Sequence, residues 1–200
     1  MILIALAVFA ANACVDKQVP ADAAFELVGE YACVEAVWGG GAIDLNGDAV
    51  AGNDLMVEFS GLETALLAIT ERRCVVSFDE SNYSGTVVFN VPAQYLTYEK
   101  STGKYEWDSC GITVPYQVLF GLDNKGKLIF QDCDKPSFSS SPQDDGPVIV
   151  GAGLDYFGKA EVSTQEEGCL SATVNTSYYD WVSQGWKAGQ IQLSYEKISK

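Results

Sequence analysis

The sequence predicts an all-β protein with one short helical segment near residues 53–69, and three observations support this prediction. From residue 74 onward, apolar and polar residues alternate with a period of two, in segments rich in Val, Ile, Tyr, Phe and Thr. Turn-forming residues such as Gly, Asn, Asp and Ser separate these segments. A helical period occurs in one stretch. Many short strands joined by hairpins are typical of an antiparallel barrel or sandwich.

The first residues have the features of an export signal. Residues 1–13 read MILIALAVFAANA, an apolar run of about ten residues followed by small ones. A membrane-spanning helix needs roughly 20 apolar residues, so this run is too short to be one. The stretch from Ala11 to Cys14 resembles the lipobox of bacterial lipoproteins, in which the cysteine becomes lipidated. We expect a signal peptide over 1–13, a lipidated tether over 14–24 and a single domain over 25–200.

The predicted helix follows an acidic turn. Its apolar residues step by four, three, four and three, which places them on one helical face; they are Leu55, Phe59, Leu62, Leu66 and Ile69. Asn53 or Asp54 can cap its start. Ser60 and Glu63 have the spacing of a capping box, so a break and restart of the helix at Ser60 is an alternative.

Ten segments have the composition and alternation of strands. They are 74–78, 86–91, 94–99, 104–108, 112–122, 127–131, 148–152, 154–162, 169–177 and 190–198. In the last of them, Ile191, Leu193 and Tyr195 are predicted to face inward, while Gln190, Gln192, Ser194 and Glu196 face outward.

Charge and composition exclude several classes of function. The chain has 12 basic and 27 acidic residues, a net charge of −15, and no histidine. Without histidine there is no Ser-His-Asp triad, no Cys-His dyad and no histidine-ligated zinc. A protein with a net charge of −15 repels the phosphates of nucleic acid, so nucleic acid is not an expected partner.

One acidic loop has the ligands of a calcium site. Asp44, Asn46 and Asp48 place oxygen-bearing side chains at the first, third and fifth positions, as an EF-hand loop does. The Gly and the terminal Glu of that loop are missing, and Glu58 on the helix is the acid that can replace the latter. Oxygen-only ligands favour a hard cation, so we expect weak Ca²⁺ binding, with an acidic turn and a helix cap as the alternative.

Two further patterns are less specific. The aromatic run over 178–186 has the residues to stack sugars or lipid, but we favour core residues at alternate positions and a loop that closes one end of a barrel. A glycosidase needs two carboxylates at a set distance from each other. Among 27 acidic residues some pair will meet this distance by chance, and no motif singles out one pair.

Several short motifs resemble bacterial lipocalin-like envelope lipoproteins. Gly29-Glu30-Tyr31, after Leu27 and Val28, is similar to the Gly-x-Trp that opens the first strand of lipocalin-type barrels. The acidic insertion over 44–48 with the helix that follows it also resembles this family. So do the cysteine-led strand that ends Phe78-Asp79 and the later Cys110. The resemblance covers roughly residues 25–198 and implies an antiparallel lipocalin-like β-barrel displayed on the envelope. It assigns no ligand and no catalytic residue.

The cysteines stand at positions 14, 33, 74, 110, 133 and 169. An oxidising compartment permits disulfides, and lipidation of Cys14 leaves at least one of the other five unpaired. By the resemblance to the family, Cys74 and Cys110 are expected to form a bridge.

These expectations combine into one functional hypothesis. The protein is expected to be a non-enzymatic, exported lipoprotein at the bacterial outer membrane or cell surface. The lipid on Cys14 is expected to anchor the protein to the membrane. Its small barrel is expected to bind a hydrophobic or glycan-like ligand or a protein partner. The alternatives are a structural or interaction domain with a filled core and, less favoured, a carboxylate-dependent hydrolase.

Overall fold

The computed structural model describes residues 22–60, 69–94, 96–99, 101–107, 112–131, 133, 157–165 and 168–198. Strands dominate this part of the chain, as the alternation predicted. The elements are α1 (Asp22–Leu27), β1 (Gly29–Trp38), α2 (Leu55–Glu58), β2 (Cys74–Asp79), β3 (Ser84–Ala93), β4 (Leu96–Glu99), β5 (Lys104–Trp107), β6 (Ile112–Leu122), β7 (Leu128–Phe130), β8 (Ala160–Thr164), β9 (Cys169–Asp180) and β10 (Gly185–Lys197).

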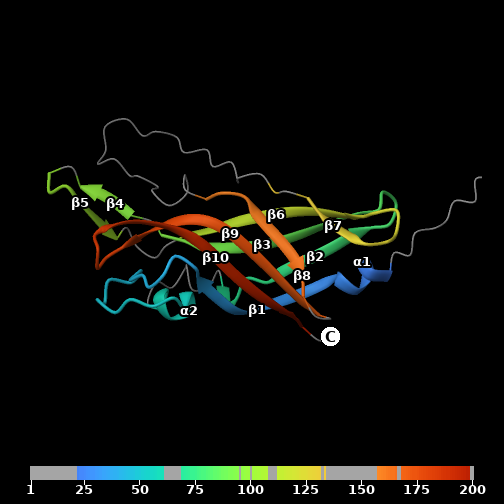
Figure 1. Cartoon of the computed structure of the whole chain (residues 1–200), viewed down its shortest axis with the longest axis horizontal. Helices are drawn as coiled ribbons and strands as arrows, with labels where there is room; N and C mark the ends of the chain where they lie inside the picture. Colours follow the sequence, from blue (N-terminus) through green and yellow to red (C-terminus); the bar gives the residue numbers. More distant parts are fainter. Residues whose placement is uncertain are drawn as a thin grey trace, which may run out of the picture.

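Eight of these strands form one antiparallel, barrel-like sheet that is nearly closed. Their order is β7-β6-β3-β2-β1-β10-β9-β8, and β4 pairs with β5 in a separate hairpin. The seam lies between β7 and β8, where a bridge between Cys133 and Ala160 joins the two sides. The molecule is elongated: α1 and the end of β10 lie at one end, and the β4–β5 hairpin lies at the other (Figure 1). The predicted all-β barrel fold is confirmed.

A bulge in β1 keeps both halves of that strand facing the core. The pairing of β1 with β10 shifts between Cys33 and Glu35, and Val34 between them is 47% exposed. Without this extra residue, a strict period of two would turn Trp38 outward, because Tyr31 already faces inward. Instead Tyr31 and Trp38 are both buried.

Aromatic side chains fill the barrel. Phe89 stacks on Tyr116 at a centroid distance of 5.5 Å, and Trp38 contacts Tyr178 at 5.2 Å. Phe157 lies 6.5 Å from both Tyr116 and Tyr178 and joins the two groups. All five side chains are at most 1% exposed. Ring contacts of this kind add to the free energy gained by burying the rings, so the barrel has a packed core.

The predicted elements compare with the structure as follows. The strand predicted over 112–122 matches β6, while β3, β9 and β10 extend beyond their predictions at one or both ends. The helix starts at Leu55 as predicted, and the Asp54 side chain accepts the Met56 N–H at 2.9 Å as its N-cap. α2 ends at Glu58, with Phe59 as its C-cap, so the predicted helix does not continue through residues 59–60. Residues 61–68 of the predicted helix and the predicted strand over 148–152 lie outside the described residues. Of the strand predicted over 154–162, residues 157–159 are not strand and β8 begins at Ala160.

Neither β1 nor α1 follows from the alternation that predicts the other strands. α1 begins at Asp22, inside the segment predicted as a tether, and it packs on the sheet through Phe25, whose ring lies 5.5 Å from Phe78.

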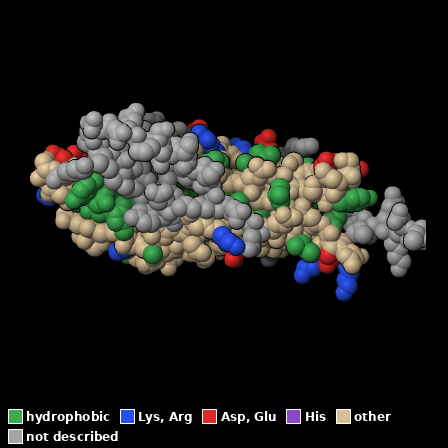
Figure 2. All heavy atoms as spheres, turned by 90° about the horizontal axis from the view of Figure 1, so that it is seen from above, with side chains coloured by type: hydrophobic (Ala, Val, Ile, Leu, Met, Phe, Trp, Pro, Cys, Tyr) green, Lys and Arg blue, Asp and Glu red, His purple; other side chains and the backbone are tan. Residues whose placement is uncertain are grey.

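Exposed apolar side chains on the outer surface are spread over many strands. Val88, Leu119 and Ile129 are 36%, 45% and 51% exposed, from three neighbouring strands. Figure 2 shows apolar side chains at several separate places on the face that contains β6 and β7. Scattered apolar residues are ordinary for a protein surface.

The tight interior predicts that a single added methyl group is destabilising at Gly189. An alanine there would place its Cβ 2.5 Å from Cζ2 of Trp38 and 2.9 Å from Cα of Gly40. We expect Gly189→Ala to lower the free energy of unfolding by about 1–3 kcal/mol, measured by urea denaturation. Gly121→Ala is the matched control, because the nearest atom to its Cβ would be the Tyr83 carbonyl oxygen, at 3.5 Å. Equal stability of both variants would show that the interior is not packed as described.

Candidate functional site

The predicted calcium ligands lie in a loop that closes one end of the barrel. The Asp44 carboxylate accepts the N–H groups of Gly47 at 2.7 Å and Ala49 at 3.0 Å. The Asn46 side chain accepts the Asp48 N–H at 3.0 Å, and Asp48 accepts the Val50 N–H at 2.8 Å. Each of these three side chains therefore stabilises the turn by accepting backbone N–H groups.

Two buried carboxylates hold this loop from opposite sides. Asp180 of β9 accepts the N–H of Asp44 at 2.9 Å, and Glu58 of α2 accepts the N–H of Leu45 at 3.0 Å. Asp180 also forms a 2.8 Å ion pair with Lys187. Asp180 is fully buried and Glu58 is 3% exposed. Because successive backbone amides are bound by the two acids, the loop is fixed between β9 and α2.

The two acids have opposite protonation tendencies. Burial raises the pKa of Glu58, and the nearby negative charges of Asp44 and Asp48 add to this, although backbone hydrogen bonds oppose it. Burial also acts to raise the pKa of Asp180, but the hydrogen bonds from Lys187, Ser183 and the Asp44 N–H outweigh it, so this pKa lies well below its ordinary value. Asp180 is therefore ionised throughout the physiological range.

The structure brings the predicted calcium ligands into one region but does not assemble them as a metal centre. Among the described residues, which include all four predicted ligands, no group of three or more His, Cys, Asp or Glu side chains is placed to hold a metal ion. Calcium binding by Asp44, Asn46, Asp48 and Glu58 stays a prediction.

The predicted disulfide between Cys74 and Cys110 stays a prediction, because the structure describes only one of its two cysteines. Cys74 is a free thiol and only 1% exposed, while Cys110 lies outside the described residues. Cys74 faces the barrel interior, and burial raises the pKa of its thiol to about 12. Such a thiol stays protonated at neutral pH and is a weak nucleophile for disulfide exchange. The predicted lipidation residue, Cys14, also lies outside the described residues.

The aromatic run over 178–186 packs against the rest of the structure, but its buried residues do not alternate as expected, because Tyr178, Tyr179 and Asp180 are all buried. Tyr178 is fully buried and its hydroxyl donates to the Pro92 carbonyl at 2.5 Å, across the interior. On the outer side, Tyr105 of the hairpin contacts Tyr179 at 4.8 Å and Trp186 at 5.7 Å, with interplanar angles of 50° and 87°. Tilted and edge-on rings cover one another, so they form no flat platform for a sugar.

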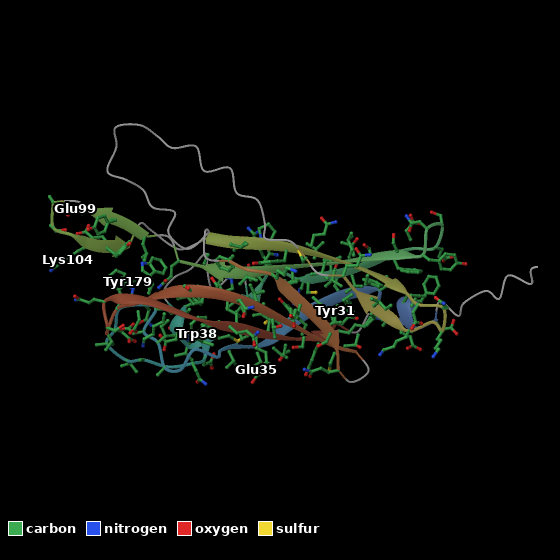
Figure 3. The ribbon with its side chains drawn as sticks, turned by 45° about the horizontal axis from the view of Figure 1, so that its top comes forward. Tyr31, Glu35, Trp38, Glu99, Lys104 and Tyr179 are labelled. Atoms are coloured by element: carbon green, nitrogen blue, oxygen red, sulfur yellow. The ribbon has the colours of Figure 1, made fainter. Side chains whose placement is uncertain are left out.

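Gln94 fixes the same hairpin to the barrel. Its side chain donates to the Tyr179 carbonyl at 2.8 Å and accepts the Tyr179 N–H at 2.6 Å. Glu99 and Lys104 lie on the hairpin far from Tyr31, while Tyr179 lies close to the hairpin (Figure 3).

A largely apolar groove lies at the opposite end of the barrel, where β1 starts and β10 ends. Its volume is about 870 Å³, within the range typical of small-molecule sites. Its lining combines four aliphatic side chains with a glycine, a carboxylate and an ammonium; these residues are Val28, Gly29, Glu30, Val75, Val76, Lys197 and Ile198. Val28, Val75 and Ile198 are 36–43% exposed, so the apolar walls are open to solvent.

Sequence reasoning missed Asp180, Lys187 and the groove, although one signal pointed to them. The inward alternation of β10 includes Ile191, Leu193 and Tyr195, as predicted, and the same period assigns Lys187 and Lys197 to the inward side. A lysine at an inward position needs a partner or an opening to solvent. Lys187 has a partner in Asp180, and Lys197 lies at the open groove.

Comparison with known proteins identifies no relative: no protein family, no curated protein and no solved structure matches this chain. The described residues also contain no helix that is long and apolar enough to cross a membrane.

The buried ion pair predicts a specific acid sensitivity. Lys187→Met leaves the buried Asp180 carboxylate without a charged partner. We expect this to lower the free energy of unfolding by roughly 2–3 kcal/mol at pH 7, less than for a fully buried pair because Lys187 is 34% exposed. The folded-state pKa of Asp180 is depressed, so the stability that it contributes is present above the unfolded-state value of about 4 and is lost as pH falls below it.

Urea denaturation at pH 7 and pH 3 measures both effects. The stability difference between wild type and Lys187→Met should narrow at pH 3. Lys104→Met, at the exposed hairpin, is the control and should change stability by less than about 0.5 kcal/mol. A pH-independent difference would contradict the assignment of the acid sensitivity to Asp180.

Calcium is tested by thermal melting. With a dissociation constant on the order of 10⁻³ M, about 10 mM calcium should stabilise the folded state by no more than roughly 1–2 kcal/mol. The melting temperature should therefore rise slightly with calcium, and it should not rise with zinc. Asp44→Ala should remove the shift. A melting curve that calcium leaves unmoved would show that these acids only organise the loop.

Proposed function

We propose that the protein is a non-enzymatic binding protein of the cell envelope, anchored through lipid on Cys14, and that it binds an apolar ligand in the groove beside α1. The groove is the observation that carries this proposal. A packed barrel offers little space for a ligand among its aromatic side chains, whereas the groove combines a suitable volume with solvent-open apolar walls.

The position of the groove supports the anchoring part of the proposal. The described chain begins at Asp22, eight residues after Cys14, and α1 lies at the same end of the molecule as the groove (Figure 1). A short tether from Cys14 would hold this end near a bilayer. An apolar ligand would then pass between membrane and groove over a short distance.

A hydrolytic function has weaker support. Glu58 and Asp180 differ in protonation tendency, as the acid and base of a hydrolase do. Both are buried, however, and their oxygens accept the N–H groups of Leu45 and Asp44. Neither residue lines the groove.

The packed interior favours a second candidate, a structural or interaction domain without a small-molecule ligand. The two candidates differ in one measurable property, which is saturable binding of an apolar probe.

Binding of Nile red, an uncharged apolar dye, tests the proposed function. We expect saturable binding to the purified protein, weakened about tenfold or more by Val75→Asp, because the new charge lies on the groove wall. Val88→Asp is the matched control: Val88 pairs directly with Val75, is also exposed and does not line the groove. Absence of saturable binding by the wild type would refute the proposal and favour the structural domain.

The anchor is tested separately. Cys14→Ser should move the protein from the membrane fraction to the soluble fraction, with an unchanged melting temperature, because Cys14 precedes the folded domain. Retention of the variant in the membrane fraction would exclude Cys14 as the anchor.

A further inference from the structure

We propose that the ligand of the groove is a long-chain carboxylate, bound with its chain along the apolar walls and its head group at the ammonium of Lys197. This inference rests on the proposed function, because it requires that the groove holds an apolar ligand. It adds the chemical class of that ligand and the residue that selects it.

The strand register places Lys197 at the groove. Lys197 lies directly opposite Tyr31 in the pairing of β10 with β1, at the last inward position of the strand. Its aliphatic chain crosses Gly29, where an added Cβ would lie 2.9 Å from Cε of Lys197. Gly29 also has a φ of +149°, which side-chain-bearing residues rarely adopt. Because Gly29 has no side chain, the aliphatic chain of Lys197 can pass over its backbone to reach the groove.

The ammonium of Lys197 contacts a carbonyl oxygen and an aromatic ring. Its Nζ donates to the carbonyl of Glu26 at 2.5 Å and lies 5.9 Å from the ring centroid of Tyr31. An ammonium has three N–H donors, so two remain after the bond to Glu26. Within the described residues, Lys197 forms no ion pair, whereas Lys187 is paired with Asp180.

The protein has a net charge of −15, and Lys197 places a positive charge in the groove. The Lys197 side chain is partly exposed, and the aliphatic walls beside it reduce the solvent screening of its attraction for an anion. The other charged lining residue, Glu30, is exposed and carries the opposite charge at the rim. A ligand with a single negative head group and an apolar chain complements both the charge of Lys197 and the Val28, Val75 and Ile198 walls.

A purely structural role for Lys197 makes a different prediction. The carbonyl that it binds belongs to Glu26, near the C-terminal end of α1, where a cation stabilises a helix. If capping were its whole role, removing the ammonium would lower stability and leave the preference between charged and uncharged ligands unchanged.

The experiment measures displacement of Nile red by dodecanoate and by dodecanol, which have the same chain length and differ in the charge of the head group. We expect the wild type to bind dodecanoate more tightly than dodecanol by roughly two- to fivefold, the range for a partly exposed charge pair. Lys197→Met should abolish this ratio by weakening dodecanoate alone. Lys197→Arg should restore it.

Two variants complete the test. Glu30→Gln should raise dodecanoate affinity slightly and leave dodecanol affinity unchanged, since it removes a like charge at the rim. Lys104→Met, far away on the hairpin, should leave both affinities unchanged and controls for the change in net charge.

The outcomes separate the two proposals. Nile red binding with no displacement by dodecanoate, or a dodecanoate-to-dodecanol ratio that is unchanged in Lys197→Met, overturns the assignment of the head group to Lys197 while the groove remains a binding site. Lack of Nile red binding overturns the proposed function itself.

Discussion

The packing of the barrel interior is the constraint on which the rest of the structure depends. Inward positions of an eight-stranded sheet converge on a narrow space, and here aromatic rings occupy it. Phe89, Tyr116, Phe157, Tyr178 and Trp38 follow one another along the interior through ring contacts. The acidic loop and the apolar groove lie at the two ends of this filled barrel, where strands begin or stop.

The core is covered in different ways at the two ends of the barrel. At the β4–β5 end, the loop that contains Asp44 and Leu45 is fixed by Asp180 and Glu58, and Gln94 fixes the hairpin to β9. At the other end, α1 covers the core with Ala24 and Leu27, and the Tyr31 hydroxyl donates to the Leu27 carbonyl at 2.7 Å. α1 is six residues long and leaves the groove beside it.

Much of the fold could be predicted from the sequence, because a period of two is a local signal. β6 was predicted with its exact bounds, and the inward and outward faces of β10 followed from the same period. β1 did not, because its bulge at Val34 interrupts the alternation, and only the motif at Gly29 pointed to a strand there. α1 is too short to show a helical period.

The candidate site was harder to predict, because its parts come together only through the pairing of distant strands. Lys197 lies at the groove because β10 pairs with β1, and Val75 lies there because β2 pairs with β1. The acidic loop was visible as a cluster of oxygen ligands, yet the backbone N–H groups that its side chains accept follow from the fold of the loop. The partner of Asp180 lies in the next strand, across a turn.

Lys187 and Lys197 show how position along one strand decides the role of a residue. Both occupy inward positions of β10, ten residues apart, which corresponds to about 33 Å along a strand. Lys187 meets Asp180 where the loop closes over the core, and removing Lys187 would leave the buried Asp180 carboxylate without a charged partner. Lys197 meets the carbonyl of Glu26 and an open apolar groove instead. The same residue type on the same face therefore completes the structure at one end and leaves a cation available to a ligand at the other.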